Sequence, residues 1–198
     1  MSKFVREILD DLENRSAEDD VNKYEMSAYD KLTKFERQTI EMAVTGEDEK
    51  GYAIEDWDKV IKPIVAKSRE HLDVLIKYVQ DSIQAEMMMT PLCGIAGINA
   101  NVVDFGATIN LNFLDVSNVT DMSGLFKDFD VSLHPEKGWF CKIGLDISEW
   151  NVSNVTKMAH MFDCKNVDFG DLSKWDRSGI YPSGRCRCKA QEAWPPAR

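Results

Sequence analysis

Hydrophobic positions in residues 1–90 recur at the spacing of amphipathic helices. In residues 3–14 the apolar side chains fall three and four positions apart, with acidic residues opposite them. The same spacing predicts a second helix over residues 16–46, from a serine cap to a glycine stop. A third helix is expected over about residues 55–89, with Pro63 either in its first turn or at a kink and with Pro91 ending it. The first part of the chain is therefore predicted to be a unit of about three helices.

The pattern changes after Pro91, where helical periodicity fades and β-branched residues and glycines appear. In residues 145–148, Leu-Asp-Ile-Ser, the alternation places the two apolar side chains on one face and the two polar side chains on the other. This alternation predicts a short strand.

Two stretches of the second half are near-copies of each other. Residues 114–122 read LDVSNVTDM and residues 150–158 read WNVSNVTKM, 36 positions later. A second echo links residues 146–150 to residues 171–175, at an interval of 25. Self-similarity at this period is typical of stacked units that each bury an apolar face against the next. Stacked units of this kind usually bind macromolecules, so the repeat favours a binding role over catalysis.

Four side chains recur at equivalent places in the copies. We expect Asn118 and Asn154 to hydrogen-bond the backbone of an adjacent unit, because an amide offers both a donor and an acceptor. Trp150 and Trp175 are expected to stack in register. All four are interpreted as scaffold. Each copy should also contain a short helix, whose buried face is Met122, Leu125 and Phe126 or Met158, Met161 and Phe162.

The repeated motif resembles a known family. The pattern D-L-S-x-W-N/D-V-S-N-V-T-x-M-x-x-M-F, carried here by residues 145–162, resembles the BspA-like leucine-rich repeats, the DUF285 family, over residues 109–176. The resemblance implies repeats of about 25 residues in a leucine-rich-repeat-like solenoid with one short parallel strand per repeat. This chain departs from the family by an insertion around residues 131–140, and it shows no secretion signal or wall anchor, which weakens a role in surface adhesion.

The expected fold class is therefore α+β, divided in three. Residues 1–90 form a helical domain that caps the N-terminal end of the stack, and residues 91–176 form the repeats. Residues 177–198 are rich in Gly, Arg and Pro, and we expect this tail to be disordered or non-native.

Composition restricts the partners. With 24 Lys and Arg against 34 Asp and Glu, the net charge is −10, which argues against direct binding to nucleic acid. No segment approaches the about 18 apolar residues of a membrane span, and no signal peptide opens the sequence, so we expect no membrane contact and a cytoplasmic location. For a phage-encoded protein that location would be the host cytoplasm.

Motifs for catalysis are absent from the sequence. It has no HExxH or CxxC spacing, no phosphate-binding glycine loop and no GxSxG elbow. We therefore expect no enzymatic activity, no cofactor and no metal site.

Two groups of residues are the candidate partner contacts. The first group faces away from the core along the strands and comprises Asn110, Asn112, Asp146, Ser148, Asp171 and Ser173. The second lies in the insertion and comprises His134, Lys137, Trp139 and Phe140. Aromatic side chains beside a basic residue are common energetic hot spots, although Trp139 and Phe140 could instead close the core over the insertion.

The favoured function is a non-catalytic protein–protein interaction module that binds through the repeat surface and the inserted loop. The alternative is a small acidic inhibitor or decoy, for example a phage-encoded one, that blocks a basic nucleic-acid-binding surface of a host or defence protein. Because a short stack exposes its end, two copies of the chain could pair there, and a homodimer is a further alternative.

Overall fold

The computed structural model describes residues 29–89, 102–134 and 139–176, with the backbone alone described at residues 88–89, 102–107, 132–134 and 139–141. The predicted helix at 3–14, the predicted cap at Ser16 and the tail at 177–198 lie outside the described residues. Within them the helices are α3 (Lys34–Thr45), α4 (Trp57–Val60) and α5 (Arg69–Met89). The strands are β1 (Ile64–Val65), β2 (Val102–Asn110), β3 (Leu114–Asp115), β4 (Ser132–His134), β5 (Trp139–Asp146) and β6 (Val167–Asp168). The predicted mixture of helices and strands is confirmed.

Helix α3 begins later than the predicted helix over residues 16–46. A turn at residues 30–33 separates it from the preceding chain, and Thr33 caps it through a reciprocal pair of hydrogen bonds with Glu36. The Glu36 N–H donates to Thr33 Oγ1 at 3.2 Å, while Glu36 Oε2 accepts from the Thr33 N–H at 2.7 Å. The predicted stop is confirmed, because Gly46 closes the helix in the left-handed conformation, with φ of 72°.

The predicted helix over residues 55–89 is confirmed over α5 but not before it, and Pro63 lies neither in a first helical turn nor at a kink. The chain forms α4, then β1, then α5, because Pro63 interrupts helical bonding and the next residues find partners elsewhere. The N–H groups of Ile64 and Ala66 donate to the carbonyls of Phe113 and Asp115, both at 2.9 Å. Strand β1 therefore pairs in parallel with β3, about 50 residues away.

Parallel strand pairing follows the interval of the repeat. Strand β2 pairs with β5 so that Ile109 lies opposite Leu145, 36 positions on, and β5 pairs in parallel with β6. Strand β4 pairs antiparallel with β5. We call residues 108–128 the first coil, residues 144–164 the second coil and residues 168–176 the partial third coil.

The first two coils stack through a regular series of backbone hydrogen bonds. The N–H groups of the first coil donate to carbonyls of the second at 2.8–2.9 Å, in the pairs Met122 to Lys157, Gly124 to Ala159 and Phe126 to Met161. The short helices predicted in each copy are wrong, because these N–H groups bond sideways and the segments form turns. Their predicted buried faces are confirmed, with none of the six side chains more than 6% exposed.

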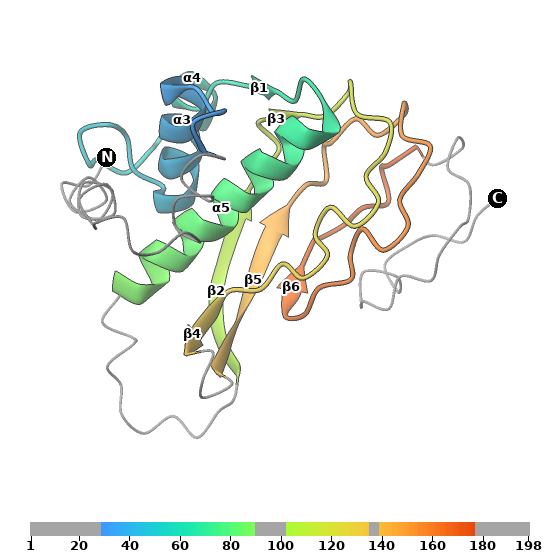
Figure 1. Ribbon diagram of the computed structural model, residues 1–198. Helices are drawn as coiled ribbons and strands as arrows, with labels where there is room; N and C mark the ends of the chain where they lie inside the picture. Colours follow the sequence, from blue (N-terminus) through green and yellow to red (C-terminus); the bar gives the residue numbers. More distant parts are fainter. Residues whose placement is uncertain (1–28, 90–101, 135–138, 177–198) are drawn as a thin grey trace.

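One hydrophobic core joins the helices to the coils. Helix α5 runs diagonally across β2 and β5, with α3 at its side and the coils beyond (Figure 1). Trp150 and Trp175 stack with their ring centres 6.5 Å apart and planes within 4°, as predicted. The Asn154 amide donates to the Ser117 carbonyl of the first coil at 2.9 Å, which confirms its bonding role. No helix in the described segments is long and apolar enough to cross a bilayer.

Candidate functional site

The six outward-facing residues predicted as contacts form the same turn three times. In each turn a side-chain oxygen accepts from the N–H two positions later, in the pairs Asn110 with Asn112 (2.9 Å), Asp146 with Ser148 (3.0 Å) and Asp171 with Ser173 (2.9 Å). The Asn112 Oδ1 also accepts from the Glu149 N–H at 2.9 Å, which links the first coil to the second. The three turns therefore form one row along the stack, which we call the turn row.

The turn row carries negative charge at neutral pH. Burial raises the pKa of Asp146, but hydrogen bonds from Ser148 and Asn112 outweigh it and hold the pKa below the usual value. The Ser173 N–H and hydroxyl lower the pKa of Asp171. Both carboxylates are consequently ionised and already ordered as acceptors within their turns.

Two hollows adjoin the turn row and share Asp146 and Ser148. The strand pocket, with a cavity volume of about 480 Å³, is lined by Thr108, Lys142, Ile143, Gly144, Asp146, Ser148, Asp168, Gly170, Asp171 and Lys174. The junction pocket, of about 570 Å³, is lined by Trp57, Asp58, Ile61, Pro63, Asn110, Asn112, Phe113, Asp146, Ser148 and Glu149. Five of the six predicted strand-side contacts thus gather around two neighbouring cavities, and Ser173 lines neither.

The junction pocket lies where the helical segment meets the carboxyl ends of parallel strands. Helix α4 sits at the end of the sheet toward which the β2 and β5 arrows point (Figure 1). Two of the apolar lining residues, Ile61 and Phe113, are only 4% and 8% exposed. The carboxyl ends of parallel strands are a common place for binding sites, because turns from several strands converge there.

The strand pocket mixes both signs of charge. It is lined by Lys142 and Lys174 as well as by three aspartates, and Lys174 Nζ lies 3.2 Å from Glu149 Oε1 on the rim. Its floor is close-packed, because Gly144 of β5 lies opposite Thr108 of β2 with no room for a side chain between them.

The described parts of the insertion form an antiparallel pair of strands at the other end of β5, which we call the hairpin. The backbones of His134 and Trp139 pair across β4 and β5, and Phe140 pairs with Ser132. Lys137 lies outside the described residues, as do the side chains of the other three predicted contacts. The hairpin is at the amino end of β5 and the turn row is at its carboxyl end, so the two predicted groups occupy separate surfaces (Figure 1).

Sequence reasoning missed the helical side of the junction pocket. Trp57 and Ile61 fall within the predicted helix over residues 55–89, and their spacing carries no signal that α4 is a separate turn facing the repeats. Glu149 had a local signal, since it lies between Ser148 and Trp150 of the motif.

A metal centre finds no support in the described part of the chain. No group of three or more His, Cys, Asp or Glu side chains there is arranged so that it could hold a metal ion. His160 is engaged by its own turn, with Nδ1 2.6 Å from Asp163 Oδ2, and the Cys164 thiol is free of a disulfide. The side chain of Cys141 lies outside the description.

Comparison with known proteins identifies one segment. Residues 100–184 match the model of a family described as "Mycoplasma protein of unknown function, DUF285". No curated protein and no solved structure matches the chain. The match covers both coils and the partial third coil, in agreement with the resemblance of residues 109–176. Residues 100–184 of this chain are thus a DUF285 segment.

Proposed function

We propose that the chain is a non-catalytic protein-binding module whose contact surface is the turn row with its two pockets. The observation that carries this proposal is the repetition of one polar turn in three successive coils, beside cavities that the same residues line. Regular arrays of outward-facing polar groups on stacked units suit an extended protein partner.

We further propose that the coils form a short leucine-rich-repeat-like solenoid capped by the helical segment. Support comes from the backbone ladder between the first two coils and from the parallel pairing of β1 with β3. A rigid stack would hold the turn row in a fixed geometry, which lowers the entropy cost of binding. Capping by α5 and β1 would leave the turn row as the accessible edge.

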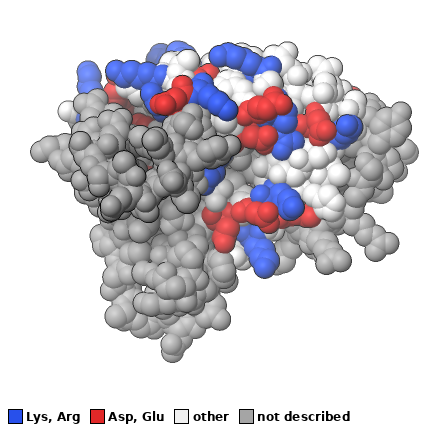
Figure 2. Space-filling view, in the orientation of Figure 1, with Lys and Arg blue, Asp and Glu red and all other residues white. Residues whose placement is uncertain are grey.

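The acidic-decoy alternative rests on the net charge of −10. The face shown in Figure 2 carries Lys and Arg interspersed with Asp and Glu, so its charge is less one-sided than a mimic of nucleic acid requires. The salt dependence of binding separates the two proposals, because exposed charge pairs are screened by salt.

The experiment is affinity capture from lysate of the source cell with three forms of the full chain. The test variant is Ser148→Arg/Ser173→Arg, which places bulk and opposite charge on the turn row. The control is Ser153→Arg, because Ser153 forms the same kind of turn with Asn151 at 3.2 Å but lines neither pocket. Captured proteins are identified by mass spectrometry after washes at low and at high salt.

We expect the wild type and the control to retain one partner after both the low-salt and the high-salt wash. The double variant should lose that partner. A partner held equally by all three forms would remove the turn row as the contact surface. A partner lost by every form at high salt would make the acidic decoy the better proposal. Replacing Trp139 and Phe140 by alanine tests the hairpin separately, with a loss above about 2 kcal/mol expected if they are hot spots.

A further inference from the structure

The junction pocket combines an apolar wall with an acidic rim. Its apolar side comes from three residues. Trp57 lies on α4, Ile61 directly follows α4, and Phe113 follows β2. The rim carries the carboxylates of Asp58, Asp146 and Glu149, and the described lining includes no lysine or arginine. The strand pocket differs in this respect, since Lys142 and Lys174 line it.

The acidic groups come from both halves of the chain. Asp58 belongs to α4 and is exposed, whereas Asp146 is half-buried at the end of β5. Two lysines that do not line the pocket contact its acidic residues. Lys174 pairs with Glu149, and Lys62 Nζ donates to the Asp58 backbone carbonyl at 3.2 Å. The charge of Lys174 also acts on Asp146, so a ligand would meet a rim whose three acidic residues outnumber the two neighbouring lysines.

From these features we propose that the junction pocket binds the side chain of an arginine or lysine presented by the protein partner; this proposal rests on the proposed function. Charge complementarity selects a cation, and the apolar wall selects one with a long aliphatic stem. A guanidinium gains twice, because it can stack on an indole such as Trp57 and bond carboxylates in its plane. The volume of about 570 Å³ is ample for one such side chain.

The amides beside the carboxylates are bonded within the protein and hold the rim in place. The Asn110 and Asn112 oxygens are turned toward backbone N–H groups of their own turn and of the next coil. Asn112 and Ser148 also donate to Asp146, which fixes the carboxylate in place. A preorganised carboxylate of this kind loses little freedom when a cation docks.

The test uses nuclear magnetic resonance of the full chain labelled with ¹⁵N and a defined probe, the peptide Ac-Gly-Arg-Gly-NH₂. Its matched control is the same peptide with citrulline, which keeps the shape of arginine and removes the charge. We expect saturable shifts of the Trp57 indole N–H and of the Asn110 and Asn112 amides, with binding at least tenfold tighter for the arginine peptide.

The protein variant for this test is Asp58→Asn/Asp146→Asn. The first coil already uses asparagine at the position equivalent to Asp146, so the turn survives the change. We expect this variant to weaken arginine binding at least tenfold. Asp128→Asn, which removes one charge from an exposed residue outside both pockets, should leave binding unchanged.

Equal binding of the citrulline peptide, unchanged binding by the double variant, or no saturable shift would overturn this proposal. Its failure is distinguishable from failure of the proposed function. If the partner is captured through the turn row while the arginine probe does not bind, the protein-binding proposal stands and the cation pocket falls. If the probe binds while no partner depends on the turn row, the junction pocket does bind a cationic side chain, but the proposed protein-binding function falls.

Discussion

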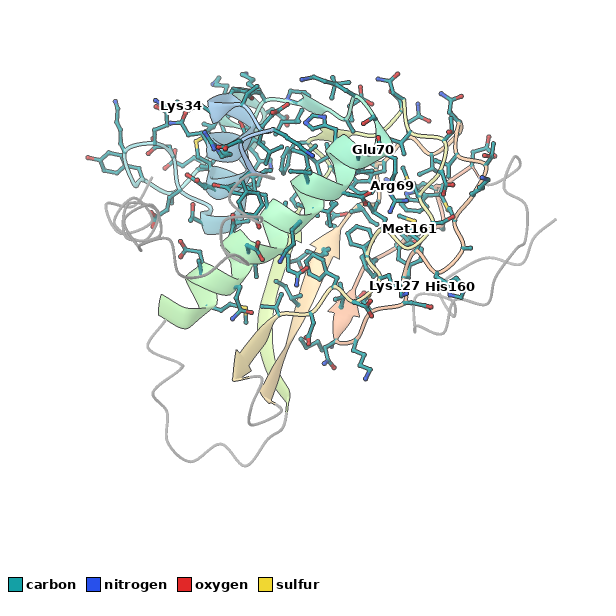
Figure 3. The ribbon with its side chains drawn as sticks, viewed as in Figure 1. Lys34, Arg69, Glu70, Lys127, His160 and Met161 are labelled. Carbon is teal, nitrogen blue, oxygen red and sulfur yellow. The ribbon has the colours of Figure 1, made fainter. Side chains whose placement is uncertain are left out.

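Arg69 donates from Nη1 to the backbone carbonyl of Ser123 at 2.9 Å, and to that of Asp121 at 3.1 Å. These carbonyls are equivalent to those of Lys157 and Ala159 in the second coil, which accept from N–H groups of the first coil. One guanidinium at the start of α5 therefore supplies the bonds that a preceding coil would supply (Figure 3). Gln80, further along α5, donates to the Asp130 carbonyl just after the first coil, at 2.7 Å.

Replacing Arg69 should consequently destabilise the first coil. In Arg69→Met the two carbonyls lose their donor while the apolar stem is kept, and we expect a loss of about 2 kcal/mol. Arg69→Lys should be intermediate, because an ammonium cannot bond both carbonyls and Asp73 in one plane. Urea unfolding followed by circular dichroism measures both. Lys59→Met is the control, since the Lys59 side chain is 81% exposed. If Arg69→Met lowers the free energy of unfolding no more than Lys59→Met does, Arg69 does not cap the first coil.

Trp150 should contribute more than burial alone. Its indole N–H donates to the Leu111 carbonyl at 2.9 Å, and its ring stacks between Phe126 and Trp175, at centroid distances of 6.0 and 6.5 Å. Trp150→Phe keeps an aromatic ring but removes one of two donors to the Leu111 carbonyl, which still accepts from the Leu114 N–H at 3.0 Å, for an expected loss of about 1 kcal/mol. Trp150→Ala should cost about 3–5 kcal/mol. Trp57→Phe in the half-buried α4 serves as the comparison, and an equal effect there would contradict the stacking role.

The repeat was predictable because its information is local. Six identical residues within a stretch of nine set the interval of 36, and β2 and β5 pair at that interval. The helical half was less predictable, because its deviations depend on distant partners. Residues 64–65 leave the helical pattern because Pro63 interrupts helical bonding and β3 offers them a parallel strand. The spacing around Arg69 likewise gives no sign of acceptors more than 50 positions away.

The turns within the coils follow the same logic. Met122 and Phe126 have the spacing of a helical face, and their burial was predicted correctly from it. Their N–H groups bond the second coil, so the i to i−4 bonds of a helix cannot form. Likewise the predicted strand-side contacts lie in one row, but α4 completes the junction pocket from a region whose periodicity placed it in a longer helix.

Gly144 should tolerate no side chain. A Cβ there would lie 2.5 Å from Thr108 Oγ1 and 3.2 Å from its Cα. We expect Gly144→Ala to cost about 1–3 kcal/mol through overpacking between β2 and β5. Thr108→Ala removes the closest contact, so the double variant should be more stable than Gly144→Ala alone. Urea midpoints of the four proteins form a double-mutant cycle, and strict additivity would show that the two residues do not clash.

The aspartates of the first coil should make stability depend on acid pH. The Ser117 hydroxyl and N–H lower the pKa of Asp115 below its usual value of 3.8, and Ser123 does the same for Asp121. Because the folded state favours the charged form, these groups stabilise the fold above the unfolded pKa. That contribution is lost as the pH falls through the lowered folded-state pKa. Acidification from about pH 5 to about pH 3 should therefore lower the urea midpoint of the wild type.

The variant Asp115→Asn/Asp121→Asn separates this effect from other titrations. Asparagine keeps the acceptor that the turn needs, as Asn151 shows by accepting from the Ser153 N–H, but it does not titrate. The midpoint of the variant should thus fall less steeply with acid than that of the wild type. Burial raises the pKa of Asp130 and of Glu86, so these groups act in the opposite direction, and they do so equally in both proteins. Parallel curves for the two proteins would mean that the turns gain nothing from charge and that asparagine and aspartate serve them alike.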